Sequence, residues 1–201
     1  MDRVSFWLDD ARNLVIYAGQ PGALTQYIPD LIVLNPQYFA VKRTLQNLQV
    51  LAYYNFPVPP VMTDLNYDWP IEPSKTPLPH QKITANFLAL RRRAFCLSDP
   101  GVMKTLSTLW AMDFAMLHAP EKFKALIVAP LTLLDTVWSA AIFRNFLDRR
   151  TFALLTGDGN KRMKRLEEDV DVYIINPDGL KVGAHIRRKV DPRRPHQKRI
   201  E

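Results

Sequence analysis

The segment Ala125-Leu126-Ile127-Val128-Ala129 is wholly apolar, and Val172-Tyr173-Ile174-Ile175 is almost so. Both predict strands that are buried on two faces. The periodicity of the surrounding chain adds strands at 94–97 and 152–155 and helices at 80–92, 104–117, 133–146 and 160–168. Strands that alternate with helices in this way indicate a parallel sheet covered on both faces. The fold class expected for residues 80–180 is therefore α/β.

The residues before this region predict a different arrangement. Residues 1–56 are expected to form a small α+β accessory segment, with short strands at 13–17 and 31–34 and a helix at 45–54. Residues 57–79 contain seven prolines, which disfavour both helices and interior strands, so this stretch is predicted to be a linker. Its aromatic rings, in the segment 67–70, are expected to anchor in the core rather than on a neighbouring domain.

The composition is that of an ordinary globular protein, because 47% of the 201 residues are hydrophobic and 23% are charged. The single cysteine, Cys96, excludes an internal disulfide and a cysteine-only metal site. No apolar run is long enough to span a bilayer, and the first residues lack the order of a signal peptide. A cytoplasmic location is therefore expected.

The net charge of +7 is concentrated at one end of the chain. Residues 1–180 hold 19 Lys and Arg against 18 Asp and Glu, whereas residues 181–201 hold 8 against 2. This last segment lacks apolar runs and is predicted to be a disordered basic tail. Its role stays open between a solvated tail and weak, non-specific contact with nucleic acid.

A candidate phosphate-binding loop lies between the predicted strand at 94–97 and the helix that begins at Lys104. Such a loop needs small residues that let backbone N–H groups approach phosphate, a lysine for the phosphate charge, and a Ser or Thr hydroxyl for Mg²⁺. Gly101, Lys104 and Thr105 supply these groups. The general pattern GxxxxGK[ST] is not satisfied, because Ser98 and Met103 occupy the positions of its two glycines.

Three segments in order resemble a known family: Pro79-His80-Gln81-Lys82, then residues 95–105, then residues 126–138. Together they resemble the first half of the motor of superfamily-two helicases, and most of all the Swi/Snf-type ATPases and bacteriophage-encoded DEAD/DEAH helicases. The resemblance runs from about Asn66 to Leu180. It implies a partial RecA-like lobe that binds ATP and Mg²⁺ and belongs to a DNA-dependent ATPase.

The resemblance also implies roles for individual residues. Gln81 resembles the glutamine that reads adenine, and Thr105 resembles the residue whose hydroxyl holds Mg²⁺. The implied ATP-binding residues are Gln81, Ser98, Asp99, Pro100, Gly101, Val102, Met103, Lys104 and Thr105. The implied contacts to the nucleic-acid backbone are Pro130, Leu131, Thr132 and Asn176.

Two departures from the family pattern lead us to expect a chain that does not turn over ATP. Met103 replaces a glycine where the backbone approaches the phosphates, so ATP binding is expected to be weak or lost. No strand ending in Asp-Glu follows residue 180, and no second lobe with an arginine finger follows either, although hydrolysis needs those groups. A second polypeptide that supplies the missing lobe is a possible partner.

The alternative function is a non-enzymatic binding module, derived from a helicase lobe, that engages nucleic acid or a protein. A small P-loop kinase or GTPase is disfavoured because Gln81 precedes the loop and no base-reading motif follows it. The basic residues 91–93 are interpreted as complementing a helix dipole rather than contacting DNA. The segment 161–165 is interpreted as a solvated helical turn rather than a phosphate clamp.

Overall fold

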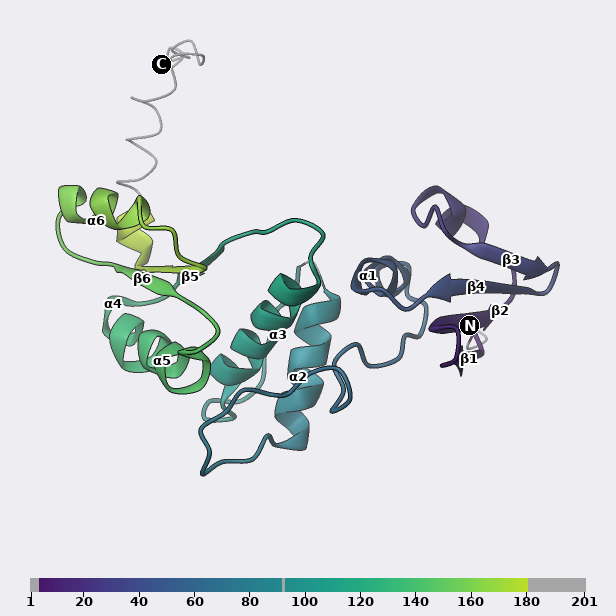
Figure 1. Ribbon diagram of the computed structural model, residues 1–201, viewed down its shortest axis with the longest axis horizontal. Helices are drawn as coiled ribbons and strands as arrows, with labels where there is room; N and C mark the ends of the chain where they lie inside the picture. The colour runs from purple at the N-terminus through teal and green to yellow at the C-terminus, as the bar shows by residue number, and fades with distance from the viewer. Residues whose placement is uncertain (1–3, 92, 181–201) are drawn as a thin grey trace, which may run out of the picture. The chain divides into compact units, whose positions relative to one another are not determined.

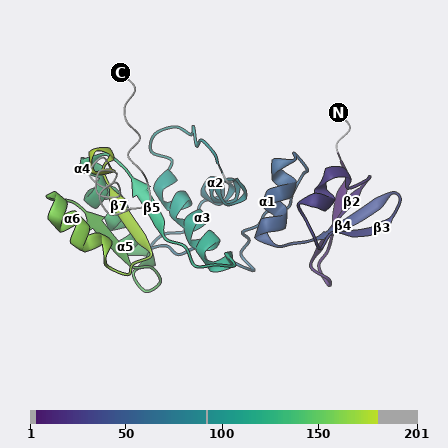
Figure 2. The ribbon, with the colours of Figure 1, turned by 90° about the horizontal axis from the view of Figure 1, so that it is seen from above.

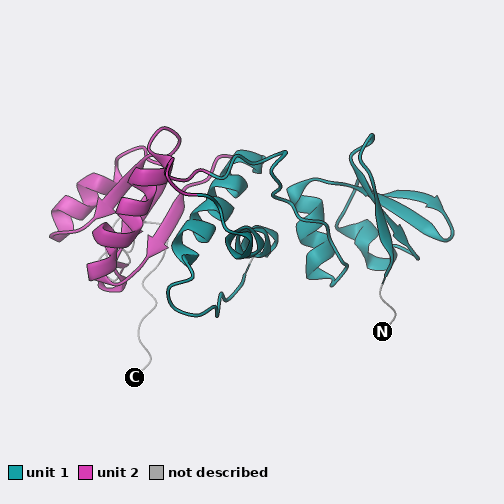
Figure 3. Ribbon diagram, turned by 90° about the horizontal axis from the view of Figure 1, so that it is seen from below, with its two compact units in different colours: residues 1–69, 76–120 teal, residues 70–75, 121–201 magenta. Residues whose placement is uncertain are grey.

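The computed structural model describes residues 4–91 and 93–180. The chain divides into two compact units, which Figure 3 shows in different colours. Unit 1 comprises Met1–Trp69 and Thr76–Pro120, and unit 2 comprises Pro70–Lys75 and Glu121–Glu201. The predicted basic tail at 181–201 lies outside the described residues, so its prediction stays untested.

Unit 1 begins with an antiparallel sheet in the order β1-β2-β4-β3. The strands are β1 (Phe6–Asp9), β2 (Leu14–Ala18), β3 (Ile32–Asn35) and β4 (Tyr38–Lys42), with a 3-10 turn η1 (Gly22–Gln26) between β2 and β3. Rings of Tyr17, Phe39 and Phe56 pack together on one face of this sheet, with centroids 5.3 to 6.0 Å apart. The sequence predicted two of these strands and missed β1 and β4.

Three helices complete unit 1: α1 (Leu45–Tyr53), α2 (Pro79–Leu90) and α3 (Lys104–His118). The Thr44 hydroxyl accepts a hydrogen bond from the Asn47 N–H at 3.2 Å and so caps α1. Helices α2 and α3 lie side by side (Figures 1 and 2). All three helices begin within a residue or two of their predicted starts.

The proline-rich stretch anchors its aromatic rings on α3. The Trp69 ring lies 5.2 Å from the Trp110 ring, and the Tyr67 ring lies 5.7 Å from the Phe114 ring. Because Tyr67 and Trp69 are both buried within unit 1, the predicted core anchoring is confirmed.

The same stretch carries a polar network around Asp64. The carboxylate of Asp64 pairs with the Lys82 ammonium and accepts a hydrogen bond from the Trp69 indole N–H at 2.7 Å. These hydrogen bonds, the one from Lys82 first, lower the pKa of Asp64 below its ordinary value. The network joins residues 64–69 to α2.

Unit 2 contains a parallel sheet in the order β5-β7-β6, formed by β5 (Ala125–Val128), β6 (Phe152–Leu155) and β7 (Val172–Ile175). All four residues of β7 are buried, as expected of a central parallel strand. The α/β fold class and the three parallel strands are therefore confirmed for residues 121–180.

Among the described residues of unit 2, the helices are α4 (Leu131–Leu133), the π-helical segment η2 (Leu134–Ser139), α5 (Ala140–Phe146) and α6 (Gly159–Leu166). The crossovers β5 to β6 and β6 to β7 run in opposite directions across the sheet. Because such crossovers are right-handed, α5 and α6 cover opposite faces, as Figure 1 shows. The helix predicted at 133–146 is present within an uninterrupted helical run from Leu131 to Phe146, in which η2 is a π-helical segment.

The strand predicted at 94–97 is absent, which is a correction to the sequence prediction. Residues 94–97 adopt no regular structure, and the side chains of Phe95 and Leu97 are 87% and 90% exposed. A strand is stabilised by its neighbours, and no described strand pairs with this segment. The candidate loop therefore follows irregular chain rather than the end of a strand.

Candidate nucleotide-binding loop

The loop at 98–103 turns into α3 through two residues with left-handed backbone conformation. Gly101 has φ of +86°, and Met103, the N-cap of α3, has φ of +54° and ψ of +39°. No side chain caps this helix. The N–H groups of its first turn, which have no helical partner, are therefore left without a side-chain acceptor.

Lys104 holds the loop in place from the first turn of α3. Its ammonium donates to the carbonyl oxygens of Ser98 and Asp99, each at 2.7 Å. The loop side of this contact is open, because Ser98, Asp99 and Gly101 are exposed. A cation and free backbone N–H groups thus meet at one exposed helix end, and both favour an anion.

Met103 carries the conformational cost that the sequence anticipated. A residue with a Cβ in the left-handed region pays about 1–2 kcal/mol relative to the right-handed conformation. Its side chain is 54% exposed, so burial offsets little of this cost. Glycine would adopt the same backbone without the penalty.

The amide of Gln81 makes hydrogen bonds inside unit 1 through both its oxygen and its nitrogen. The side chain is 1% exposed, and its Oε1 accepts a hydrogen bond from the Leu78 N–H at 2.9 Å. Its Nε2 lies 3.5 Å from the Met103 sulfur, to which it donates a weak hydrogen bond. Gln81, whose implied role is to read adenine, therefore contacts the candidate loop through Met103, one of the two residues that replace glycines of the general pattern. No local sequence signal could have revealed this contact, because the two residues lie 22 positions apart.

Cys96 lies just before the loop, half-buried rather than in a core strand. Its sulfur is 3.5 Å from the Ser98 hydroxyl. That hydrogen bond lowers the pKa of the thiol below its ordinary value, and the nearby Lys104 charge lowers it further. The thiol therefore reports on the charge at Lys104.

The residues with an implied role at nucleic acid lie in unit 2, whereas the candidate loop lies in unit 1. Pro130 precedes α4, and Leu131 and Thr132 form its exposed first turn. Asn176 directly follows β7, and the Ala129 N–H donates to the Ile175 carbonyl at 3.0 Å. The structure therefore brings residues 130–132 and Asn176 to the same carboxyl edge of the parallel sheet.

Asn176 is 8% exposed, and its Oδ1 has no hydrogen-bond partner among the described residues. Gly179, three residues on, has no room for a side chain. A Cβ there would lie 2.6 Å from Nη1 of Arg162 and 2.7 Å from Cγ1 of Ile175. Glycine at 179 therefore lets α6 approach the end of β7, a requirement that the sequence did not reveal.

No protein-family model and no curated protein matches this chain. Within residues 4–91 and 93–180, no helix has the length and apolarity that crossing a membrane requires.

Proposed function

We propose that this chain is the ATP-binding part of a DNA-dependent ATPase of the helicase class, with a RecA-like lobe built on the parallel sheet. It binds magnesium-ATP weakly at residues 98–105 and nucleic acid at the carboxyl edge of the sheet. By itself it does not turn over ATP.

The observation that carries the ATP-binding proposal is the contact of Lys104 with the carbonyl oxygens of Ser98 and Asp99 at the uncapped start of α3. The lysine is held within the loop, and the N–H groups of a 15-residue helix are open to an anion. Gly101 supplies the positive φ that lets the loop turn before the helix begins.

The residues of the loop fit a nucleotide phosphate, and Thr105 fits the magnesium that accompanies it. Lys104 would neutralise phosphate charge, and the first N–H groups of α3 would orient the phosphate oxygens. The Thr105 hydroxyl is on the first turn of the same helix and is the hard oxygen ligand that Mg²⁺ prefers. Bound Mg²⁺ would offset the charge of the phosphates.

The part of the site around Gln81 fits the adenine base less well than the loop fits phosphate. The Gln81 amide already donates to Met103 and accepts from the Leu78 N–H. Reading a base edge at Gln81 would require the Met103 side chain to leave the amide. This requirement supports weak binding.

The absence of turnover follows from chemistry that the 201 residues do not supply. Phosphoryl transfer needs a residue that orients water and groups that stabilise the developing charge. The 201 residues contain no Asp-Glu pair. Phosphate release is therefore expected to stay at background with or without DNA.

Calorimetric titration of magnesium-ATP tests the ATP-binding proposal. Wild type is compared with Lys104→Gln and with Lys82→Gln, a control that removes a lysine from the neighbouring helix α2. Lys104→Gln should abolish binding, and Lys82→Gln should leave it unchanged. Equal affinity in all three proteins would refute the assignment of the loop.

One observation favours the second candidate, a binding module without ATP. The Gln81 amide has both of its polar groups satisfied within the protein. A module of this kind would bind DNA and show no heat with magnesium-ATP in the same titration.

A further inference from the structure

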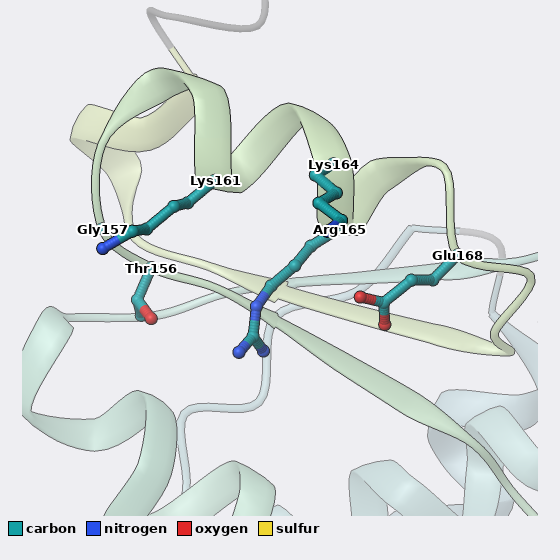
Figure 4. Close-up of a pocket in the computed structure, with 6 residues that line it drawn as sticks. All are labelled: Thr156, Gly157, Lys161, Lys164, Arg165 and Glu168. Carbon is teal, nitrogen blue, oxygen red and sulfur yellow. The ribbon is translucent and has the colours of Figure 1, made fainter.

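A charged face of α6 borders a hollow at the carboxyl end of β6. Lys161, Lys164, Arg165 and Glu168 follow one another at helical spacing, so they lie on one side of the chain. With Thr156 and Gly157 they line a hollow of about 450 Å³, which Figure 4 shows in close-up.

The hollow is built from a well-supported element. The Asp158 carboxylate accepts a hydrogen bond from the Lys161 N–H at 2.9 Å and caps α6. Gly157, with φ of +90°, brings the loop against the Lys161 side chain. The Arg165 guanidinium donates to the Leu154 carbonyl at 3.1 Å and ties the helix to β6.

The cations around the hollow have no carboxylate partner in the part of the chain that the structure describes. Elsewhere in unit 2, Lys75 pairs with Glu72 at 2.6 Å and Lys124 pairs with Asp169 at 2.8 Å. By contrast, no carboxylate of the described residues lies within 4.0 Å of the cationic groups that line the hollow, on Lys161, Lys164 and Arg165. Glu168 is the one acid in the lining, so the cations outnumber it by three to one.

Figure 4 shows how these charges are arranged. Lys161 extends toward Gly157 at one end of the hollow, and Glu168 stands at the other end. The Arg165 guanidinium reaches across between them. Thr156 adds a neutral hydroxyl beside the Lys161 end. Ammonium, guanidinium and hydroxyl donors around one concave surface are the groups that bind phosphate.

We propose that this hollow is a phosphate-binding site, with Lys161 and Lys164 as charge contacts and Arg165 as a directional donor. The sequence favoured a solvated helical turn over a phosphate clamp here; the side chains are exposed as that interpretation expects, and the shared lining and the missing carboxylate partners support our proposal of a clamp. The phosphate is a diester of a nucleic-acid backbone or a free phosphate. The first source rests on the proposed function, and the second does not.

The test uses the full chain and the double variant Lys161→Gln/Lys164→Gln, which keeps helix-forming side chains while removing two charges. The matched control is Lys75→Gln/Lys122→Gln, which removes the same charge from residues of unit 2 that do not line the hollow. Fluorescence anisotropy measures the affinity of each protein for a labelled DNA duplex over a series of salt concentrations.

If both lysines contact backbone phosphates, the plot of log K against log salt should become shallower by about 1.8 in the double variant. At about 50 mM salt the affinity should fall roughly tenfold or more, since each lost contact removes its counterion release. The control should keep the wild-type slope. An unchanged slope in the double variant, or an equal loss in the control, overturns a backbone contact at this hollow.

Titration with inorganic pyrophosphate separates the two sources. Weaker pyrophosphate binding in the double variant than in wild type and control supports the phosphate site whether or not DNA binding changes. If the double variant loses pyrophosphate binding while DNA affinity is unaffected or absent, the ligand is a free phosphate. The proposed DNA contact then depends on residues 130–132 and 176 alone. If neither ligand distinguishes the double variant from wild type, the site does not exist.

Discussion

Replacing Met103 distinguishes two effects of this side chain: the strain of a left-handed backbone and the contact with the Gln81 amide. Met103→Gly removes the Cβ that the left-handed backbone disfavours and also removes the thioether that occupies the Gln81 amide. Met103→Ala removes the thioether and keeps the Cβ. The pair of variants therefore distinguishes conformational strain from obstruction of the base site.

The stability difference can be worked out from the backbone. Relief of the left-handed conformation contributes about 1–2 kcal/mol to the glycine variant. The greater freedom of glycine in the unfolded chain offsets roughly 0.5–1 kcal/mol of this. Both variants lose the same exposed thioether, so Met103→Gly should be more stable than Met103→Ala by up to about 1.5 kcal/mol. Urea unfolding of the two proteins measures this difference.

The affinity for magnesium-ATP should change equally in both variants, because strain present in free and bound protein cancels. Freeing the Gln81 Nε2 for the base is worth about 1 kcal/mol, or about fivefold in affinity. Calorimetry should show this gain in Met103→Gly and Met103→Ala and none once Lys104→Ala is added. Unchanged ATP affinity in both variants would refute the obstruction, and a Met103→Gly variant less stable than Met103→Ala would refute the strain.

Three further predictions concern other residues. Alkylation of Cys96 by iodoacetamide should slow in Lys104→Ala, because loss of the lysine charge raises the pKa of the thiol. It should also slow when magnesium-ATP binds, because the phosphates offset the same charge. An alkylation rate that neither change affects would contradict nucleotide binding at this loop. The pKa of Asp64 is lowered on folding, so the stability it adds is present above its unfolded pKa, near 3.8, and is lost as pH falls through the lower folded value. Wild type and Asp64→Asn should therefore differ in urea midpoint at pH 5, and the difference should shrink as the pH is lowered below 3.8, whereas a difference that stays constant would exclude this linkage. Gly179→Ala should lower the free energy of unfolding by about 1–3 kcal/mol, because its Cβ would lie 2.7 Å from Ile175. An unchanged free energy of unfolding would show that the turn has room for a side chain.

The elements that sequence predicted well are those whose signal is local. Helix α3 matched because its apolar positions recur at helical spacing from Lys104 onward. Strands β5 and β7 formed where continuous apolar runs predicted them. The predicted burial on both faces is confirmed for β7 but is wrong for β5, because Leu126 and Val128 are exposed.

The failures depend on contacts between distant residues. Residues 94–97 have the composition of a strand, but a strand needs a paired neighbour, and the described sheets offer none. The Gln81 to Met103 contact joins α2 to the N-cap of α3 across 22 positions, so no short window of sequence reveals it.

Hydrogen–deuterium exchange with and without magnesium-ATP tests the central proposal most directly, because it locates the ligand as well as detecting it. In wild type, magnesium-ATP should slow exchange in peptides that cover residues 98–108, where the loop and the uncapped N–H groups of α3 would meet phosphate. In Lys104→Gln the same peptides should exchange at their ligand-free rates. Exchange at residues 98–108 that magnesium-ATP leaves unchanged in wild type would contradict the proposal that this loop binds nucleotide.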